Sequence, residues 1–326
     1  MSFDECIHRL NNNGVCILPS ETVYGLACSA LSAEAVQKVF KLKGRPSSNP
    51  LIVHVLDHRD ASRICLTNPI SEKLSQFFWP GPLTLVLPKK NCVPPEVTAG
   101  LDTVGVRSPS HPKFRKILSS VGFPLAAPSA NKSNKISPTS YDDVKGEFGL
   151  DSPPIIDGGT CELGIESTVL DLTTNPPQIL RLGMCTKDQI EDVIGIKIRG
   201  VNKITRSHLN NLASKKSPGL MSKHYCPDTP LILYRTIDKL IESLPSIKDE
   251  VIILPKKSHN LSVDNAHTFY LSEFGDPIEI AHNLYHILHL SDRLNKKRIH
   301  ASLLDNKNEI FSAINDRLSR ASANCL

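Results

Sequence analysis

The sequence predicts an α/β protein of two domains, and three observations support this prediction. At 326 residues the chain is long enough to form two hydrophobic cores. Short apolar runs alternate with amphipathic segments over roughly the first 200 residues, which is typical of α/β folds. After a polar and basic stretch the same alternation resumes. We therefore expect a first domain at residues 1–200, a linker at 201–230 and a smaller second domain at 231–326.

Six apolar runs predict the strands of the first domain. Each is short and is bounded by turn-forming or polar residues, as strands usually are. The runs are Val15–Pro19, Leu51–Val55, Leu83–Pro88, Thr103–Arg107, Ser167–Leu172 and Gln178–Leu182.

Three amphipathic segments of the first domain predict helices with recognisable ends. Ser32 and Thr186 are suited to cap two helix N-termini, because their hydroxyls can accept from free backbone N–H groups. Gly122 and Gly195 are suited to end two of them. The expected helices span residues 32–43, 111–122 and 186–195.

The pattern breaks between residues 201 and 230, which are polar, basic and interrupted by prolines such as Pro218 and Pro227. We interpret this stretch as a linker. Strands alternate with helices again beyond it, which predicts a small α/β domain with a largely parallel sheet. Strands are expected at 231–234, 251–255, 268–271 and 299–304, and helices at 236–244, 278–294 and 310–321.

Composition limits the class of protein. A formal charge of +5 favours an anionic ligand without demanding nucleic acid, so any basic site must be local. The nine cysteines are scattered and form no C-x-x-C pair, which predicts reduced thiols. The N-terminus has no signal-like apolar run, and no later window is apolar enough to span a membrane. We expect a soluble cytoplasmic protein.

The stretch "KLKGRPSSNPLIVHV", Lys41–Val55, is the first candidate site. The sequence has neither a G-x-x-x-x-G-K-[ST] nor a G-x-G-x-x-G loop, so a bound nucleotide would be held mainly by side chains. Here Gly44 permits a close turn, and Arg45 offers a planar fork for two phosphate oxygens while Lys43 adds a point charge. The alternative is a solvated basic turn after a helix.

Polar residues at strand ends are the next candidates. Thr22, in "PSETVYGLA", can bind a small polar substrate or belong to a helix N-cap cluster. Arg107 ends an apolar strand and either pairs with a structural acid or binds a ligand carboxylate. His54 lies in an apolar strand, where a core histidine is the usual case.

Two later segments carry small polar side chains. "APSANKSNKISPT" can offer Ser129, Asn131 and Ser137 to phosphate and ribose oxygens, or form turns that cap themselves. Ser167 begins one strand and Arg181 ends another, and either can be scaffold. No Ser/His/Asp order and no metal-spaced carboxylate pair competes with these candidates.

Taken together, the motifs resemble those of the YrdC-type threonylcarbamoyl-AMP synthase family. The motifs are "SETVYGLA", "KLKGRPSSNPL", "GVRSP", "APSAN", "ISPT", "GIESTVLD" and "ILRLG", in this order over about residues 6–200. "KSPGLMSKHYCP" looks like the linker motif of the longer, two-domain members, and "AINDRLSRA" resembles the end of their C-terminal domain.

The resemblance implies a fold and a reaction. The first domain would have a twisted mixed sheet with a concave basic cavity, and the second would be Rossmann-like. Members make L-threonylcarbamoyladenylate from L-threonine, bicarbonate and ATP and release pyrophosphate. The product then serves the machinery that modifies adenosine 37 of tRNAs, and Mg²⁺ would be carried by the ATP phosphates.

The resemblance also assigns roles to residues. Lys43 and Arg45 would be catalytic, holding the triphosphate as pyrophosphate leaves. His224 and Tyr225 of the linker would act as a lid. The ATP site would include Arg45, Asn49, Thr103, Ser129, Ser137 and Arg181. The L-threonine site would include Thr22, His54, Arg107, Ala127 and Ser167.

Three positions depart from the family pattern. Leu182 stands where a proline is usual, and Met221 and Ser222 stand where Lys and an aromatic residue or His are common, which bears on lid closure.

Two other functions stay open. One alternative function is a non-catalytic module that binds double-stranded RNA or tRNA. The other is a carbamoyl transferase of hydrogenase maturation, but such proteins carry C-x-x-C repeats that this sequence lacks.

Overall fold

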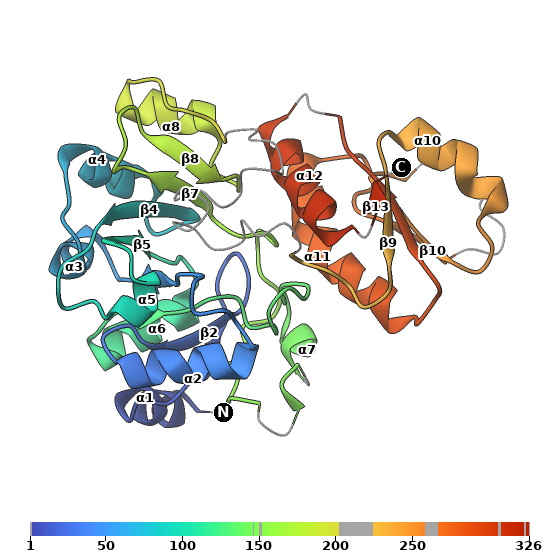
Figure 1. Cartoon of the computed structure of the whole chain (residues 1–326). Coiled ribbons are helices and arrows are strands. Elements are labelled where there is room, and N and C mark those ends of the chain that lie inside the picture. Colours follow the sequence, from blue (N-terminus) through green and yellow to red (C-terminus); the bar gives the residue numbers. More distant parts are fainter. Residues whose placement is uncertain are drawn as a thin grey trace.

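The computed structural model describes residues 2–145, 147–149, 152–201, 224–257, 267–305, 308–322 and 324–325. Figure 1 shows two sheets, a large one built by the N-terminal part of the chain and a smaller one built by the C-terminal part. Among the described residues, no helix is long and apolar enough to cross a membrane.

The large sheet is mixed. Its strand order is β1-β2-β6-β3-β5-β4-β7-β8. The pairs β3–β5 and β4–β7 are parallel and the remaining neighbours are antiparallel. All six predicted strands are confirmed. The strands are β1 (Cys16–Leu18), β2 (Gly25–Ser29), β3 (Ile52–His54), β4 (Leu83–Pro88), β5 (Thr103–Arg107), β6 (Leu125–Ala126), β7 (Thr168–Asp171) and β8 (Gln178–Arg181).

The sequence did not predict β2 and β6. Strand β2 consists of small residues, "GLACS", without the β-branched side chains that indicate strands. It pairs antiparallel with β1, Cys16 opposite Ala27, so the polar segment between the two strands is the turn of a hairpin. The alternative that Thr22 belongs to a helix N-cap cluster is therefore wrong. Strand β6 has only two residues, too few to show a period.

The predicted helices of the first domain are confirmed with their caps. Ser32 and Thr186 accept from the N–H groups of Ala35 and Gln189, and Gly122 and Gly195 end their helices with a left-handed backbone. Five further helices were not predicted. The helices are α1 (Phe3–Asn11), α2 (Ala33–Lys43), α3 (His58–Ile64), α4 (Pro69–Phe78), α5 (Pro95–Thr98), α6 (Pro112–Val121), α7 (Tyr141–Val144) and α8 (Lys187–Ile194).

The smaller sheet is parallel at every described pairing, in the order β11-β10-β12-β9-β13. The expected largely parallel α/β domain is thus confirmed. Residues of α11 and α12 share one hydrophobic core with the sheet, and residues of α10 share another. The elements are β9 (Leu231–Tyr234), α10 (Ile237–Ser243), β10 (Val251–Leu254), β11 (His267–Tyr270), α11 (Pro277–Arg293), β12 (Ile299–Ser302), α12 (Glu309–Ala321) and β13 (Asn324–Cys325).

The two domains share a hydrophobic core. Val23, Ile136 and Ile165 of the first domain belong to the same buried cluster as the residues of α11 and α12, the two helices that face the first domain in Figure 1. Leu182, the departure from the family pattern, packs against this cluster and against the main core of the first domain. Leu182 therefore makes apolar contact with both domains.

Helix α11 approaches the first domain closely at Gly164. A Cβ atom on Gly164 would lie 2.4 Å from the carbonyl oxygen of His282, and Gly164 has a φ of +73°. Both the contact and the backbone conformation therefore require glycine at this position.

Most of the predicted linker, including Met221 and Ser222, lies outside the described residues. The described end of the linker runs from His224 to Pro230 and reaches β9. Within it, Cys226 donates its N–H to the carbonyl of Asn134, which ties this end to the first domain.

Candidate functional site

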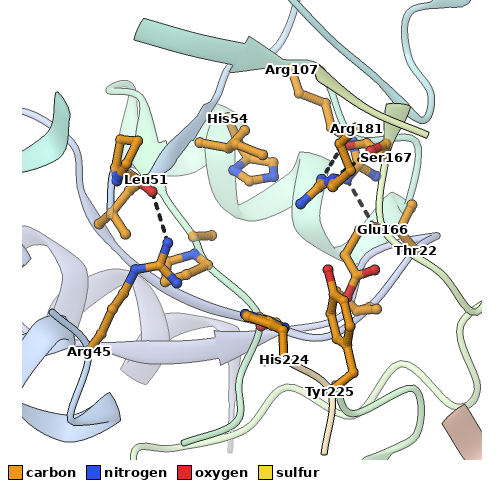
Figure 2. A pocket seen from close by; sticks show the side chains of 16 residues that line it. Thr22, Arg45, Leu51, His54, Arg107, Glu166, Ser167, Arg181, His224 and Tyr225 are labelled. Atoms are coloured by element: carbon orange, nitrogen blue, oxygen red, sulfur yellow. Dashed lines mark hydrogen bonds between the residues drawn. The ribbon is translucent and has the colours of Figure 1, made fainter. Parts of the chain in front are cut away.

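One pocket brings together most of the residues singled out from the sequence (Figure 2). Its free space is about 50 Å³, room for a few water molecules. The pocket is therefore closed to a molecule as large as a nucleotide. The predicted residues that line it are Thr22, Arg45, His54, Arg107, Ala127, Ser129, Ser167, Arg181, His224 and Tyr225.

Arg45 folds back over its own turn and lines the pocket. The left-handed Gly44 ends α2, and the next residues return so that Arg45 donates Nε–H to the carbonyl of Asn49 at 3.1 Å and Nη2–H to that of Pro50 at 3.0 Å. Burial lowers the pKa of Arg45 to about 9, so the group is still cationic at neutral pH. Among the described residues, Arg45 donates to carbonyl oxygens and pairs with no carboxylate, which leaves a buried charge suited to an anion.

Lys43 lies behind the pocket rather than in it. It is almost fully buried at the end of α2, and its ammonium donates to the carbonyls of Ser129 and Asn131. Burial lowers the pKa of Lys43 well below its usual value. The lysine therefore fastens the "APSAN" segment to α2, and that segment supplies the Ala127 and Ser129 side of the pocket.

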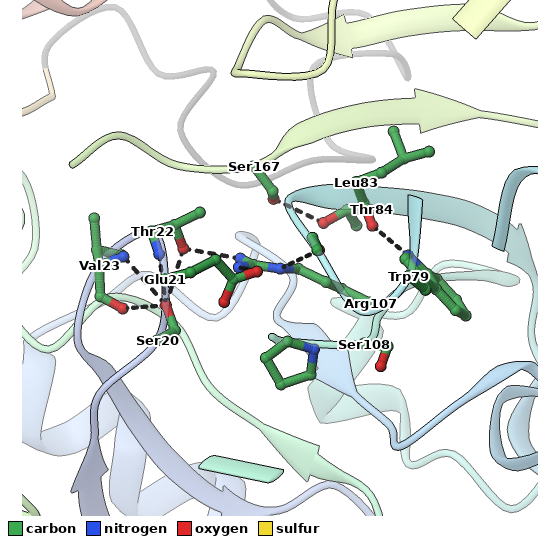
Figure 3. A network of polar contacts seen from close by, with 12 residues as sticks. Ser20, Glu21, Thr22, Val23, Trp79, Leu83, Thr84, Arg107, Ser108 and Ser167 are labelled. Carbon is green, nitrogen blue, oxygen red and sulfur yellow. Dashed lines mark hydrogen bonds and ion pairs between the residues drawn. The ribbon is translucent and has the colours of Figure 1, made fainter. Parts of the chain in front are cut away.

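Arg107, at the end of β5, pairs with a structural acid, and it also lines the pocket (Figure 3). Its Nη2 forms an ion pair with Glu21 at 2.6 Å, Nη1–H donates to Thr22 Oγ1 at 2.9 Å, and Nε–H donates to the carbonyl of Gly81 at 3.2 Å. The hairpin turn that carries Glu21 and Thr22 is thereby held against β5. The guanidinium is fixed in place while it still faces the pocket.

His54, on β3, lies beside this cluster and is neutral. Burial, and then the charge of Arg107, lower the pKa of His54 to about 3. Its ring packs on Phe114 with centroids 5.0 Å apart. No described residue hydrogen-bonds Nδ1, so this nitrogen can bind a ligand in the pocket.

Arg181 and Ser167 form a third polar group at the ends of β7 and β8. Arg181 donates Nε–H to the carbonyl of Ser167 and Nη2–H to its hydroxyl, both at 3.0 Å. The Ser167 hydroxyl is also 2.8 Å from Thr84 Oγ1. Burial lowers the pKa of Arg181, and neighbouring Tyr225 and Glu166 oppose this effect. In Figure 2, Arg45 lies on one side of the pocket and Arg107 and Arg181 on the other.

Three other predicted ATP-site residues do not line the pocket. Asn49 is buried next to Arg45, which binds its carbonyl. Thr103, at the start of β5, lines a separate small cavity that shares the segment Pro50–Ile52 with the pocket. Ser137 is buried and donates its hydroxyl to Glu166 at 2.7 Å.

His224 and Tyr225, at the described end of the linker, also line the pocket. Their rings meet edge to face at 4.1 Å, and Tyr225 is 1% exposed. Tyr225 has a φ of +64°, which is uncommon for a residue other than glycine. Burial lowers the pKa of His224 to about 3, so this side chain is neutral.

The sequence reasoning missed Glu166, which also lines the pocket. It directly precedes Ser167 in the motif "GIESTVLD". Its place next to Ser167 was a usable signal, but two of its three partners, Tyr285 and Arg317, come from the second domain and gave none. The described residues contain no group of three or more His, Cys, Asp or Glu side chains placed to hold a metal ion.

Family models match nearly the whole chain. A model described as "Telomere recombination", for the Sua5, YciO and YrdC proteins, matches residues 8–183. A second, described as "Threonylcarbamoyl-AMP synthase, C-terminal domain", matches residues 185–323.

Two curated relatives and one solved structure agree with these matches. A Pyrococcus abyssi protein named threonylcarbamoyl-AMP synthase is 39% identical over 315 residues, which covers 93% of this chain and 89% of that protein. A Bacillus subtilis protein of the same name is 42% identical over 241 residues, covering 72% and 67%. The crystal structure of P. abyssi Sua5 complexed with L-threonine matches with a TM-score of 0.88 at 35% identity and covers 99% of this chain and 95% of that one.

Proposed function

The chain belongs to the threonylcarbamoyl-AMP synthase family, and we propose that its pocket joins L-threonine, bicarbonate and ATP into L-threonylcarbamoyladenylate. The protein is an L-threonylcarbamoyladenylate synthase, a nucleotidyltransferase of the tRNA threonylcarbamoyladenosine pathway. The observation that carries the proposed substrates is the pocket itself. It combines buried guanidinium groups on opposite sides with a neutral histidine and a threonine hydroxyl, a set suited to phosphates and to an amino acid.

The proposed reaction needs no protein nucleophile. The amine of L-threonine attacks the carbon of bicarbonate with loss of water, or the carbon of CO₂ with loss of a proton, and the product is a carbamate. A carbamate oxygen then attacks the α-phosphorus of ATP, and the bond from this phosphorus to the bridging oxygen of pyrophosphate breaks. The protein positions the reactants, offsets charge and excludes water.

For L-threonine we propose contacts with Thr22, His54, Arg107, Ala127 and Ser167. Arg107 would bind the carboxylate with N–H groups that its contacts with Glu21, Thr22 and Gly81 leave available, since a guanidinium has five. The hydrogen bond from Arg107 on β5 to Thr22 in the hairpin turn would keep the proposed amino-acid site in a fixed geometry.

For ATP we propose contacts with Arg45, Asn49, Thr103, Ser129, Ser137 and Arg181. Arg45 faces the pocket directly and would offset charge as pyrophosphate leaves. Lys43 would contribute from behind, through the Ser129 and Asn131 carbonyls that it holds. Asn49, Thr103 and Ser137 lie next to the pocket wall, so the nucleotide would reach them only when the pocket widens.

We propose that His224 and Tyr225 form the lid. The support is their position over a pocket with about 50 Å³ of free space. A nucleotide cannot enter while these two rings are in place, so ATP binding would require the linker to move.

Mg²⁺ is proposed to arrive with the nucleotide phosphates. Glu166, the carboxylate of the pocket wall, is already bound by Ser137, Tyr285 and Arg317. We also propose a cytoplasmic location, supported by the free thiols of the eight cysteines whose side chains the structure describes. Contact with RNA stays a prediction.

The test of the proposed substrates is pyrophosphate release by the purified protein. We expect release to require ATP, L-threonine and bicarbonate together, with L-threonylcarbamoyladenylate identified by mass spectrometry. Turnover of ATP that does not depend on both other substrates would contradict the proposal.

A further inference from the structure

The carboxylate of Glu166 is held by both domains. Ser137 Oγ donates to Oε1 at 2.7 Å, the Tyr285 hydroxyl donates to Oε2 at 3.0 Å, and Arg317 Nε–H donates to Oε2 at 3.2 Å. Ser137 belongs to the first domain, but Tyr285 lies on α11 and Arg317 on α12. A wall residue of the pocket thus takes two of these three hydrogen bonds from the second domain.

Arg317 gives this buried carboxylate a cation of its own. Burial would raise the pKa of Glu166, but the charges of Arg317 and Arg181 and the hydrogen bond from Ser137 hold it below its ordinary value. Glu166 is therefore ionised beside the proposed phosphate site. Without Arg317, its charge would fall on Arg181 and offset the cation proposed to bind ATP.

The same two side chains also support the lid. The ring centroids of Tyr285 and Tyr225 are 5.5 Å apart. The guanidinium carbon of Arg317 lies 5.9 Å from the centroid of the Tyr225 ring, within the range of a cation–π contact. Tyr225 is thus seated on the second domain.

Further contacts fix α11 on the first domain. His282 Nδ1–H donates to the carbonyl of Glu162 at 2.8 Å, and His289 Nε2–H donates to the carbonyl of Ser137 at 3.3 Å. Arg293 forms an ion pair with the buried Asp143 at 3.0 Å. With Tyr285, these residues recur every three or four positions and form one stripe of the helix. Tyr285 is therefore held rigidly at the pocket wall.

We propose that Tyr285 and Arg317 are positioning residues for the reaction, acting through Glu166 and Tyr225. They hold Glu166 so that Ser137 is fixed and the charge of Arg181 stays available to phosphate, and they seat the lid tyrosine. The second domain thereby completes the ATP side of a pocket built by the first domain. This inference rests on the proposed function.

Two mild variants of the full chain test it by steady-state kinetics. Tyr285→Phe removes the hydroxyl that contacts Glu166 Oε2 at 3.0 Å and Oε1 at 3.3 Å and keeps the ring, and Arg317→Lys keeps the charge but loses the Nε–H geometry. Because a hydrogen bond to a charged group is stronger than one between neutral groups, we expect the KM for ATP to rise about tenfold or more. The KM for L-threonine should change less than about twofold.

Tyr234→Phe is the matched control. Tyr234 is also a buried tyrosine of the second domain, and its hydroxyl lies 3.1 Å from His300 Nδ1, in the core cluster that α10 shares with the sheet. We expect this variant to lose stability comparably to Tyr285→Phe and to keep both KM values. A rise in the KM for ATP in Tyr234→Phe as well would overturn the proposal.

A second test removes the charge of Arg317 alone and then the charges of Arg317 and Glu166 together, and measures the KM for ATP. Arg317→Met should raise the KM for ATP at least about tenfold, and adding Glu166→Gln should bring it back to within about threefold, because the unpaired carboxylate is then gone. Unchanged KM values in the single variants, or equal shifts for both substrates without rescue, would sink the proposal. Failure of the proposed function would appear separately, as a wild-type protein that needs neither L-threonine nor bicarbonate.

Discussion

Arg45 is a buried cation that donates hydrogen bonds to two carbonyl oxygens. We predict that Arg45→Ala lowers kcat/KM for ATP by about 100-fold or more, the size found when one charge-stabilising donor is removed from an active site. Pyrophosphate release measures the rate, and thermal unfolding shows that the fold is kept.

Lys41→Ala is the control for Arg45→Ala. Lys41 lies four residues earlier in the same stretch but is exposed on α2 and does not line the pocket. It should keep nearly normal turnover. Equal losses in the two variants would mean that the general charge of the stretch matters, and the assigned role of Arg45 would be wrong.

His54 makes stability depend on pH in the acid range. Its pKa is about 3 in the folded protein and about 6.5 in an unfolded chain. Between these values the unfolded state binds a proton that the folded state does not, so stability falls as pH falls. From pH 6.5 to pH 4 the loss from His54 should be about 3 kcal/mol, at about 1.4 kcal/mol per unit.

Urea unfolding at several pH values checks this prediction. His54→Gln has no group that titrates here, so its free energy of unfolding should fall less steeply than that of the wild type below pH 6.5. His224 and the carboxylates contribute equally to both curves. Parallel curves would show that His54 does not take up this proton.

The site residues were predictable where the chain itself brings them together. Thr22, His54, Arg107, Ser167 and Arg181 stand at or near strand ends, Arg45 stands on the turn after α2, and all six line the pocket. The partners of Glu166 were not predictable. Tyr285 and Arg317 are 119 and 151 positions away, on helices whose patterns show a buried face but not its contacts.

Among the secondary-structure elements, local signals decided which ones could be predicted. Ser32, Thr186, Gly122 and Gly195 act as caps in the structure, because capping depends on bonds within a few residues. Strand β2 escaped prediction because Gly25, Ala27 and Ser29 lack strand propensity, and only its pairing with β1 makes it a strand.

The contact between α11 and the first domain gives a test at Gly164. Gly164→Ala would place a Cβ 2.4 Å from the carbonyl oxygen of His282, so α11 must shift. We predict a loss of about 2–3 kcal/mol in the free energy of unfolding, the strain of φ included. Urea unfolding measures it.

Gly195→Ala is the matched control, because Gly195 has a φ of +74° but no heavy atom within 4 Å of the added Cβ. It should lose only about 1 kcal/mol, from backbone strain. If Gly164→Ala costs no more than Gly195→Ala, the close approach of α11 does not limit the packing of the domains.

The whole molecule carries a net charge of only +5, while its pocket gathers three buried guanidiniums. Arg45, Arg107 and Arg181 are placed individually by strand ends and turns. The overall composition could therefore predict an anionic ligand only in general terms, and the motifs were needed to place it.

Because the domains share a hydrophobic core, we predict that they unfold together. Trp79 is the only tryptophan, packs on the main core of the first domain and donates to the carbonyl of Leu83 at 2.7 Å. Its fluorescence reports on the first domain, whereas far-UV circular dichroism reports on both. The two signals should give one transition with the same Tm.

Gly164→Ala should separate these two signals, and Gly195→Ala should not, because only the former lies between the domains. Two transitions in the wild-type protein, more than about 5 °C apart, would show that the shared cluster does not couple the domains.

The left-handed backbone of Tyr225 affects the equilibrium between molecules in which its ring lies over the pocket and molecules in which the ring is lifted. A φ of +64° costs a residue with a side chain about 1 kcal/mol or more, and the ring contacts with His224 and Tyr285 offset this cost. When the backbone of Tyr225 leaves the left-handed region and the ring lifts, the strain is relieved and those ring contacts are lost. The strain thus reduces the free-energy difference between the molecules with the ring over the pocket and those with the ring lifted by about 1 kcal/mol. This corresponds to about a fivefold change in the ratio of the two populations. A modest ligand affinity can then suffice to reverse them.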